Sequence, residues 1–488
     1  MPATSSCSST NAQFKETRGA SLEVAEYTQM SCIHNRQSRR GFIRSLASAS
    51  LLLPGMLQEL AAQTAAPDPS NPLAPKAPMF PARAKRVIFL YMSGGTSHVD
   101  TFDYKPKLIR DAGKQYNGEY LSPPRWEFKR YSKADAMVSS LFPHVGSVMD
   151  EICLINSMKN DFPNHVQAVM GLHGGSVVQQ RPSMGSWVTY GLGTENQNLP
   201  AFVVLAPEMP YGGSLVWDSN FLPACYEGVH VDDPASPIPN LIRTDPADIQ
   251  EKELGLIDYF NQRHESTREG DRMLAARVKA FETAHGMQIQ APEAFDLSKE
   301  TDATLKLYGL ERGSTKGFAW QCLVARRLAE RGVRFIELID IGSLQLVNWD
   351  AHADMKTHIP LAKNVDQPIA ALIKDLKSRG MLDETLVVWS TEFGRAPGDP
   401  DPQAKGRTHH SDCYSSWIAG GGIKGGITYG ASDDYGYQIA ENQCHVHDLH
   451  ATMLHQLGID HTKLTFRHAG RDYRLTDVSG HVIKDILA

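Results

Sequence analysis

Carboxylate and imidazole side chains in the second half of the chain lie at the ends of apolar, strand-like runs. Asp350 and His352 lie in Asn-Trp-Asp-Ala-His, Glu392 lies in Ser-Thr-Glu-Phe-Gly-Arg, and His409 and His410 form a doublet. Burying such groups together is costly unless a metal ion or polar partners accompany them. The pattern predicts a divalent-metal site at the ends of strands. The alternative is that these groups are strand-end caps, a local ion pair and surface histidines.

Polar residues earlier in the chain are candidates for the same site. His98 and Asp100 follow the first apolar run, and they would point to the same side if Ser97–Thr101 were extended. Loops rich in Gly, Ser and Asp also form plain Asx turns, which is the alternative for this segment. His165 opens an expected helix, where a neutral imidazole could merely satisfy the backbone.

Composition excludes some classes of protein. The chain has 488 residues, of which 41% are hydrophobic, so a sizeable core is expected in one large or two ordinary domains. The net charge of −6 shows no basic footprint for nucleic acid, and we expect no nucleic-acid partner.

An export signal is predicted near the start. Arg39 and Arg40 precede the weakly apolar stretch 46–60, and small residues follow it. This order resembles a twin-arginine signal and predicts a periplasmic or cell-surface location; a surface basic patch is the alternative. Glu59 and Pro54 make the stretch a poor transmembrane anchor. We expect residues 1–66 to be the signal, with a non-native extension before Met30, and 67–84 to be a Pro-rich linker.

Five cysteines follow the predicted signal, and no C-x-x-C motif occurs. The odd number favours buried thiols over a disulfide framework, although an oxidising compartment leaves one bridge open.

Continuous apolar runs alternate with helical patterns. The expected strands are 87–92, 152–155, 202–205, 333–339, 386–389 and 417–419, and the expected helices include those around 320–328, 369–376 and 448–457. Runs without polar alternation are typical of strands buried on both faces. We therefore predict an α/β sandwich around a mainly parallel sheet. The stretch of about 208–317 breaks the rhythm and is expected to be a helical insertion covering one end of the sheet.

The order of the motifs resembles the alkaline phosphatase superfamily. The matching segments are 94–103 after the first strand, 349–352, 391–395, 406–410 and the late helix 448–454. The chain is most similar to domain-of-unknown-function family 1501, an exported, sulfatase-like branch. The resemblance covers a single domain, 85–488, and implies a three-layer, alkaline-phosphatase-like sandwich.

The resemblance also implies a metal-assisted site. One or two ions of zinc, manganese or calcium would be held by residues from a set comprising His98, Asp100, Asp350, His352, Glu392, His409 and His410. Phe393 stands where the superfamily usually has a histidine, and Ser93 stands where it has an aspartate.

The usual sulfatase nucleophile is missing from the matching segment. Residues 161–165 contain no Ser, Thr or Cys. A metal-bound water would then be the nucleophile, with Asp161, His165 and Glu392 as candidate catalytic residues.

Two functions are compatible with these patterns. One is an exported metal-dependent hydrolase of sulfate or phosphate esters, acting on a small-molecule or polysaccharide substrate. The other is a non-catalytic binding or assembly module that keeps the fold and works with a co-exported protein partner.

Overall fold

The computed structural model describes residues 71–131, 136–232, 246–268, 272–341 and 348–488. The chain divides into two units, Met1–Ala61 and Ala62–Ala488. The predicted export signal lies outside the described residues. None of the helices in the described ranges is long and apolar enough to cross a membrane.

Strand β1 (Arg86–Met92) is buried along its whole length. Its neighbours β9 and β10 both run parallel to it, so both edges of its backbone are paired. The main sheet has the order β15-β6-β14-β10-β1-β9-β7-β8, with β18 also paired to β6. Its other strands are β6 (Ile152–Lys159), β7 (Phe202–Leu205), β8 (Val229–Val231), β9 (Phe335–Asp340), β10 (Thr385–Ser390), β14 (Tyr414–Ala419), β15 (Ile427–Tyr429) and β18 (Cys444–His445).

The predicted α/β class and mainly parallel sheet are confirmed. Strand β14 is the exception, because it pairs antiparallel with both β10 and β6. All six runs that the sequence predicted as strands are strands of this sheet.

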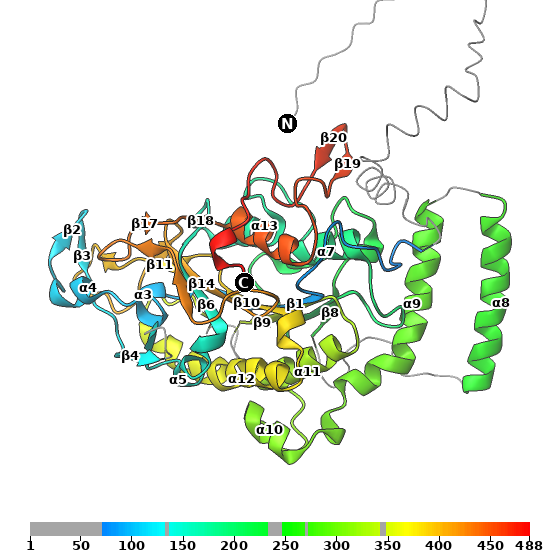
Figure 1. Cartoon of the computed structure of the whole chain (residues 1–488), viewed down its shortest axis with the longest axis horizontal. Coiled ribbons are helices and arrows are strands. Elements are labelled where there is room, and N and C mark those ends of the chain that lie inside the picture. Colours follow the sequence, from blue (N-terminus) through cyan, green and yellow to red (C-terminus); the bar gives the residue numbers. More distant parts are fainter. Residues whose placement is uncertain (1–70, 132–135, 233–245, 269–271, 342–347) are drawn as a thin grey trace, which may run out of the picture. The chain divides into compact units, whose positions relative to one another are not determined.

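Helices cover both faces of the sheet, as the alternation of side chains along β1 requires. Ile88 and Leu90 face a core shared with α11 and α12, whereas Phe89 and Tyr91 face a core shared with α6, α7 and α13. Figure 1 shows α11 and α12 on one side of the strands and α7 and α13 on the other. These helices are α6 (His165–Gly174), α7 (Met184–Leu192), α11 (Phe318–Glu330), α12 (His358–Ser378) and α13 (Val446–Gln456).

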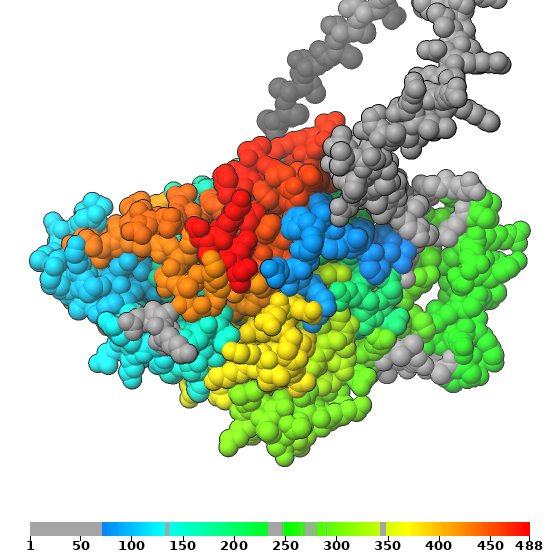
Figure 2. Space-filling model, in the orientation of Figure 1, coloured from blue at the N-terminus to red at the C-terminus, as the bar shows by residue number. Residues whose placement is uncertain are grey.

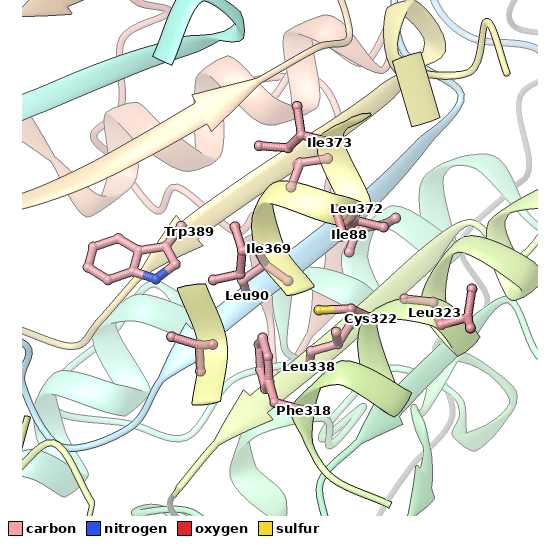
Figure 3. Packing of buried hydrophobic residues seen from close by; sticks show 14 of the residues in the cluster. Ile88, Leu90, Phe318, Cys322, Leu323, Leu338, Ile369, Leu372, Ile373 and Trp389 are labelled. Atoms are coloured by element: carbon pink, nitrogen blue, oxygen red, sulfur yellow. The ribbon is translucent and has the colours of Figure 1, made fainter. Parts of the chain in front are cut away.

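The first core is closely packed. Leu90 and Ile88 lie beside Ile369, Leu372 and Cys322, all at 0% exposure (Figure 3). Burying each such side chain contributes about 1.5–3 kcal/mol, so this layer holds α11 and α12 firmly on the sheet.

The start of α13 differs from the expectation. The helix predicted around 448–457 begins at Val446, because His445 is the N-cap and Asp448 is the third helical residue of a capping box. The Asp448 carboxylate accepts a hydrogen bond from the His445 backbone N–H at 2.9 Å, which fixes this start.

The segment from 208 to 317 adds an edge strand and several helices. Strand β8 extends the main sheet beside β7, and α9 buries Ala291 and Ala294 in the core that α11 shares. The helices of this segment are α8 (Ala247–Glu265), α9 (Arg272–Phe295) and α10 (Asp302–Tyr308).

Smaller elements complete the described chain. They include α3 (His98–Thr101), α4 (Pro106–Arg110), α5 (Pro143–Gly146) and the paired short strands β2 (Gln115–Tyr116), β3 (Glu119–Leu121), β4 (Phe128–Tyr131), β5 (Ala136–Ser139), β11 (Gly394–Arg395), β12 (Gly398–Asp399), β13 (His409–His410), β16 (Ala431–Ser432), β17 (Ile439–Glu441), β19 (Phe466–His468) and β20 (Arg471–Tyr473). The first described residues pack against the C-terminal part, where Phe80 contacts His455, as the blue and red surfaces of Figure 2 show.

The five described cysteines are free thiols, as the odd number predicted. Four are buried and Cys225 is partly exposed.

Candidate metal centre

Glu392 lies just past the carboxyl end of β10 and is fully buried. Its carboxylate accepts hydrogen bonds from the Gly94 backbone N–H at 2.9 Å and the Tyr91 hydroxyl at 3.1 Å. Strands β1 and β10 are parallel neighbours, so their carboxyl ends meet at one edge of the sheet. Ligand sites of open α/β sheets form at this edge.

His165 is the first residue of α6, and Asn164 caps the helix. The Nδ1–H of His165 donates a hydrogen bond to the Glu392 carboxylate at 2.7 Å, which leaves Nε2 facing Asp350 at 3.2 Å. This Nε2 makes no hydrogen bond of good geometry. Burial lowers the pKa of His165, but the Asp350 and Glu392 carboxylates outweigh burial and raise it overall.

His409 reaches the same place from the short strand β13. Its pairing with β11 sets His409 opposite Arg395, just beyond Glu392 in the chain. The Nδ1–H of His409 donates to the Pro163 carbonyl at 2.7 Å, so Nε2 is the nitrogen that a neutral His409 ring would offer to a ligand, and it lies 3.3 Å from Asp350 Oδ1.

Asp350 is the centre of the cluster. Its carboxylate accepts hydrogen bonds from the buried Arg395 guanidinium and, at 3.2 Å, from the Tyr211 hydroxyl. Burial raises the pKa of Asp350, but the adjacent imidazoles of His165 and His409 and the charge of Arg395 overcome burial and lower it well below its usual range. Asp350 is therefore a carboxylate at neutral pH.

These donors fit a divalent metal ion. Ligand atoms of His165, Asp350 and His409 all lie within 4.8 Å of one another. Metal-binding histidines usually donate their other ring N–H to a carboxylate or a carbonyl, and Glu392 and the Pro163 carbonyl accept these bonds here. Two imidazoles and one carboxylate suit zinc or manganese.

His352 lies at the exposed rim of the cluster, with a side chain 49% exposed. Its Nε2 is 2.8 Å from His409 Nε2 and 3.0 Å from Asp350 Oδ1. Burial, followed by the charge of Arg395, lowers the pKa of His352, so the ring is neutral at pH 7.

The structure places His98 and His410 away from this cluster. The Nε2–H of His98 donates to the Gly436 carbonyl at 2.9 Å, and that of His410 donates to the Tyr437 carbonyl at 2.7 Å. Neighbouring residues of a strand point to opposite faces, which is why His409 faces Asp350 and His410 does not.

Asp100 also has another partner. Its carboxylate accepts bonds from the buried Arg407 guanidinium and the Ser97 hydroxyl, both at 2.6 Å. Residues 98–101 form the helical turn α3 rather than an extended segment. His98 and Asp100 therefore point in different directions, because successive helical residues are rotated by about 100°.

Asp161 lies in a separate pair. Its half-exposed carboxylate accepts a hydrogen bond from His445 Nε2–H at 3.0 Å. The neighbouring Asn160 is closer to the cluster, because its amide donates to the backbone carbonyl of Glu392 at 2.8 Å. Asn160 thus braces the backbone at Glu392.

Sequence reasoning missed Tyr211. Its ring stacks on His165, with ring centres 3.9 Å apart and planes 10° apart. Burial, together with the nearby Asp350 carboxylate, raises the pKa of Tyr211. The only available signal was its place in the Gly/Pro-rich loop that follows the buried strand β7.

The fold and the cluster define an α/β protein with a candidate metal centre at the carboxyl edge of a mainly parallel sheet. The chain belongs to the family described as Protein of unknown function (DUF1501), whose model matches residues 84–487. The resemblance drawn from the motifs is therefore confirmed. None of the curated proteins compared with the chain matches it.

Solved structures with similarity to the chain include enzymes of the alkaline phosphatase superfamily. The sulfatase PsFucS1 from Pseudoalteromonas sp. is 12% identical, with 77% of this chain and 68% of that chain covered and a TM-score of 0.33. The alkaline phosphatase of the Antarctic bacterium TAB5 is 12% identical, with 72% and 94% covered and a TM-score of 0.30. The lipoteichoic acid synthase LtaP of Listeria monocytogenes is 10% identical, with 81% and 75% covered and a TM-score of 0.32.

Proposed function

We propose that this protein is an exported, metal-dependent hydrolase of sulfate or phosphate esters. The observation that carries the proposal is the shared orientation of His165 and His409. Each has its Nδ1–H bound by a fixed acceptor and its Nε2 within 3.3 Å of the Asp350 carboxylate. A metal site requires such convergence of two imidazole Nε2 atoms on a carboxylate, because each neutral ring then offers its Nε2 lone pair to the ion.

When bound, a divalent ion would polarise the ester oxygens and lower the pKa of a water molecule. His165, Asp350 and His409 would hold the ion, and Arg395 would keep Asp350 ionised and fixed in place. Glu392 would orient His165 rather than bind the ion itself. Both of its oxygens already accept hydrogen bonds, which come from Tyr91, Gly94 and His165.

His352 is placed to handle a proton. It is the most exposed imidazole of the cluster, and it is neutral at pH 7. Its ring would accept or return a proton when the ester bond is cleaved.

A non-catalytic binding module is the second candidate. The loop that leads into α6 runs Asn160-Asp161-Phe162-Pro163-Asn164 and supplies no nucleophilic side chain. A module of this kind would keep the metal and bind an ester, or a co-exported partner, without turning it over.

Metal analysis of two neighbouring variants tests the proposal. Purified protein, His409→Ala and His410→Ala are analysed by inductively coupled plasma mass spectrometry, and each is assayed on sulfate and phosphate esters with added zinc, manganese or calcium. We expect bound metal and turnover in the parent protein and in His410→Ala, and loss of both in His409→Ala. The unfolding free energy of each variant is measured alongside as the control for folding.

The outcomes separate the candidates. Bound metal without turnover of any ester would favour the binding module. Protein that takes up no metal even with excess ions would refute the metal-dependent reaction.

A further inference from the structure

A cleft of about 500 Å³ opens beside the metal centre. Its lining comprises the loop segment 207–211 together with Ser93, Ile341 and Asn348. Tyr211 belongs to both places, because it lines the cleft and its hydroxyl bonds to Asp350. The volume lies within the usual range of about 300–1,000 Å³ for small-molecule sites. A group attached to an ester held at the cluster would therefore extend into this cleft.

One hydroxyl in the lining is buried. Ser93 follows β1, is 0% exposed, and its hydroxyl interacts with the Tyr91 hydroxyl without a hydrogen bond of good geometry. Buried hydroxyls usually have a well-placed partner, so this group has hydrogen-bonding capacity left for a ligand in the cleft. Asn348 and Glu208 add further polar groups, and the accessible lining of the cleft is more polar than apolar.

The apolar part of the lining suits one face of a ring. Pro207, Met209, Pro210 and Ile341 supply apolar side chains to the cleft beside Tyr211, and Met209 is 57% exposed. A surface with a few fixed polar groups and several apolar side chains matches a ligand that has hydroxyl groups and one apolar face.

The described residues of the cleft include no cation that could receive a second anionic group. None of the described residues that line it is Lys or Arg, whereas Glu208 is acidic. Arg395 is nearby through Asp350, but it is fully buried and donates to the Gly94, Gly95 and Arg407 carbonyls and to Asp350. An anionic substituent would meet an acidic group and no available guanidinium or ammonium group.

We propose that this cleft binds the organic part of the substrate, and that this part is a single uncharged ring rather than a multiply charged chain. The inference rests on the proposed function and names its substrate class. It disfavours densely sulfated polysaccharides and favours monoesters of a phenol or of an otherwise unsubstituted sugar.

Matched substrate pairs test the proposal. Phenyl sulfate is compared with carboxyphenyl sulfate, and a monosulfated monosaccharide with its disulfated form, together with the corresponding phosphates. We expect kcat/KM to be at least about tenfold higher for the uncharged member of each pair. Faster hydrolysis of the phenyl esters would indicate an aryl group as the substrate's organic part, and faster hydrolysis of the monosaccharide esters would indicate a sugar.

A cation placed in the cleft should change this preference. Met209→Lys adds an ammonium group to the cleft. The ratio of kcat/KM for the uncharged substrate to kcat/KM for the charged substrate of each pair should then fall by about fivefold, as expected for a partly exposed ion pair. Met79→Lys is the matched control, because Met79 is also exposed, at 44%, and lies beside Asp460 rather than in the cleft. Equal kcat/KM values for the uncharged and charged substrates would overturn the proposal. So would an equal change of their ratio in Met209→Lys and Met79→Lys.

A binding measurement keeps this inference separate from the proposed function. If no ester is hydrolysed, phenol and 4-hydroxybenzoate are titrated into zinc-supplemented protein by ligand-observed NMR. Phenol binding that exceeds 4-hydroxybenzoate binding, with the difference reduced in Met209→Lys, would support the cleft while the hydrolase function fails. Absence of binding by either ligand would refute the cleft proposal.

Discussion

Replacing Glu392 with Gln isolates the role of the buried carboxylate behind His165. The substitution keeps the shape of the side chain but exchanges one oxygen for an NH₂ group. That group would face the donors that Glu392 now satisfies, namely the Tyr91 hydroxyl and the Gly94 N–H. It also removes the negative charge that raises the basicity of His165.

Two magnitudes follow from these contacts. Loss of a carboxylate partner from a metal-binding histidine typically weakens metal affinity by about 10–100-fold, or roughly 1.4–2.7 kcal/mol. Leaving a buried donor without an acceptor costs about 1–3 kcal/mol of folding stability. Glu392→Gln should therefore bind zinc about 10–100-fold more weakly and unfold at a lower urea concentration.

Glu337→Gln is the matched control. Glu337 is also fully buried, lies on strand β9 on the other side of β1, and accepts a hydrogen bond from His173 Nε2–H at 2.8 Å. The same substitution there alters a buried carboxylate–histidine pair but should leave zinc affinity unchanged, because His173 is not part of the metal cluster.

Zinc affinity is measured by competition with a chelator at pH 7, and stability by urea unfolding of the metal-free proteins. Unchanged zinc affinity in Glu392→Gln would refute the positioning role of Glu392. An equal loss of affinity in Glu337→Gln would show that the effect arises from general destabilisation and would refute the reasoning equally.

Two further predictions concern stability away from the cluster. Asp100→Asn should lower the free energy of unfolding by about 3–5 kcal/mol, because it leaves the buried Arg407 without its carboxylate partner. Zinc content should stay unchanged. Urea unfolding and metal analysis check both expectations, and loss of zinc would place Asp100 in the metal site. Burial lowers the pKa of His450 to about 3, from an ordinary value of 6.5, so only the unfolded chain binds its proton between these pH values and stability falls as the pH drops. Between pH 6.5 and pH 5 this loss of unfolding free energy is about 2 kcal/mol for His450. The stability of His450→Phe in urea should therefore decrease less than that of the parent protein over this pH range. Parallel pH profiles for the parent protein and His450→Phe would contradict the prediction.

The sheet was predictable from the sequence because burial on both faces leaves a local signature. Strands such as β1 and β10 have no polar alternation, and that pattern depends only on the residues within each strand. The helices on either side have their own periodicity, as in α12. The antiparallel direction of β14 had no such signature, because strand direction is set by the path of the chain between strands.

The candidate site was predictable in part. Asp350, His352, Glu392 and His409 were expected near one another because each was predicted at the end of a strand-like run. The choice between His409 and His410 depended on the register of β13 against β11. That register comes from a pairing between two short segments, which neither segment encodes by itself.

The sequence by itself determined which residue types were present at the strand ends and that the strands would form a buried, mainly parallel sheet. Only the tertiary structure decided which of those residues meet. It turned His98 and Asp100 away through a single helical turn, paired Asp161 with His445, and brought Tyr211 onto His165 from a distant loop. The physical reason is that hydrophobic periodicity is local, whereas a metal site requires side chains from separate segments to converge within a few ångströms.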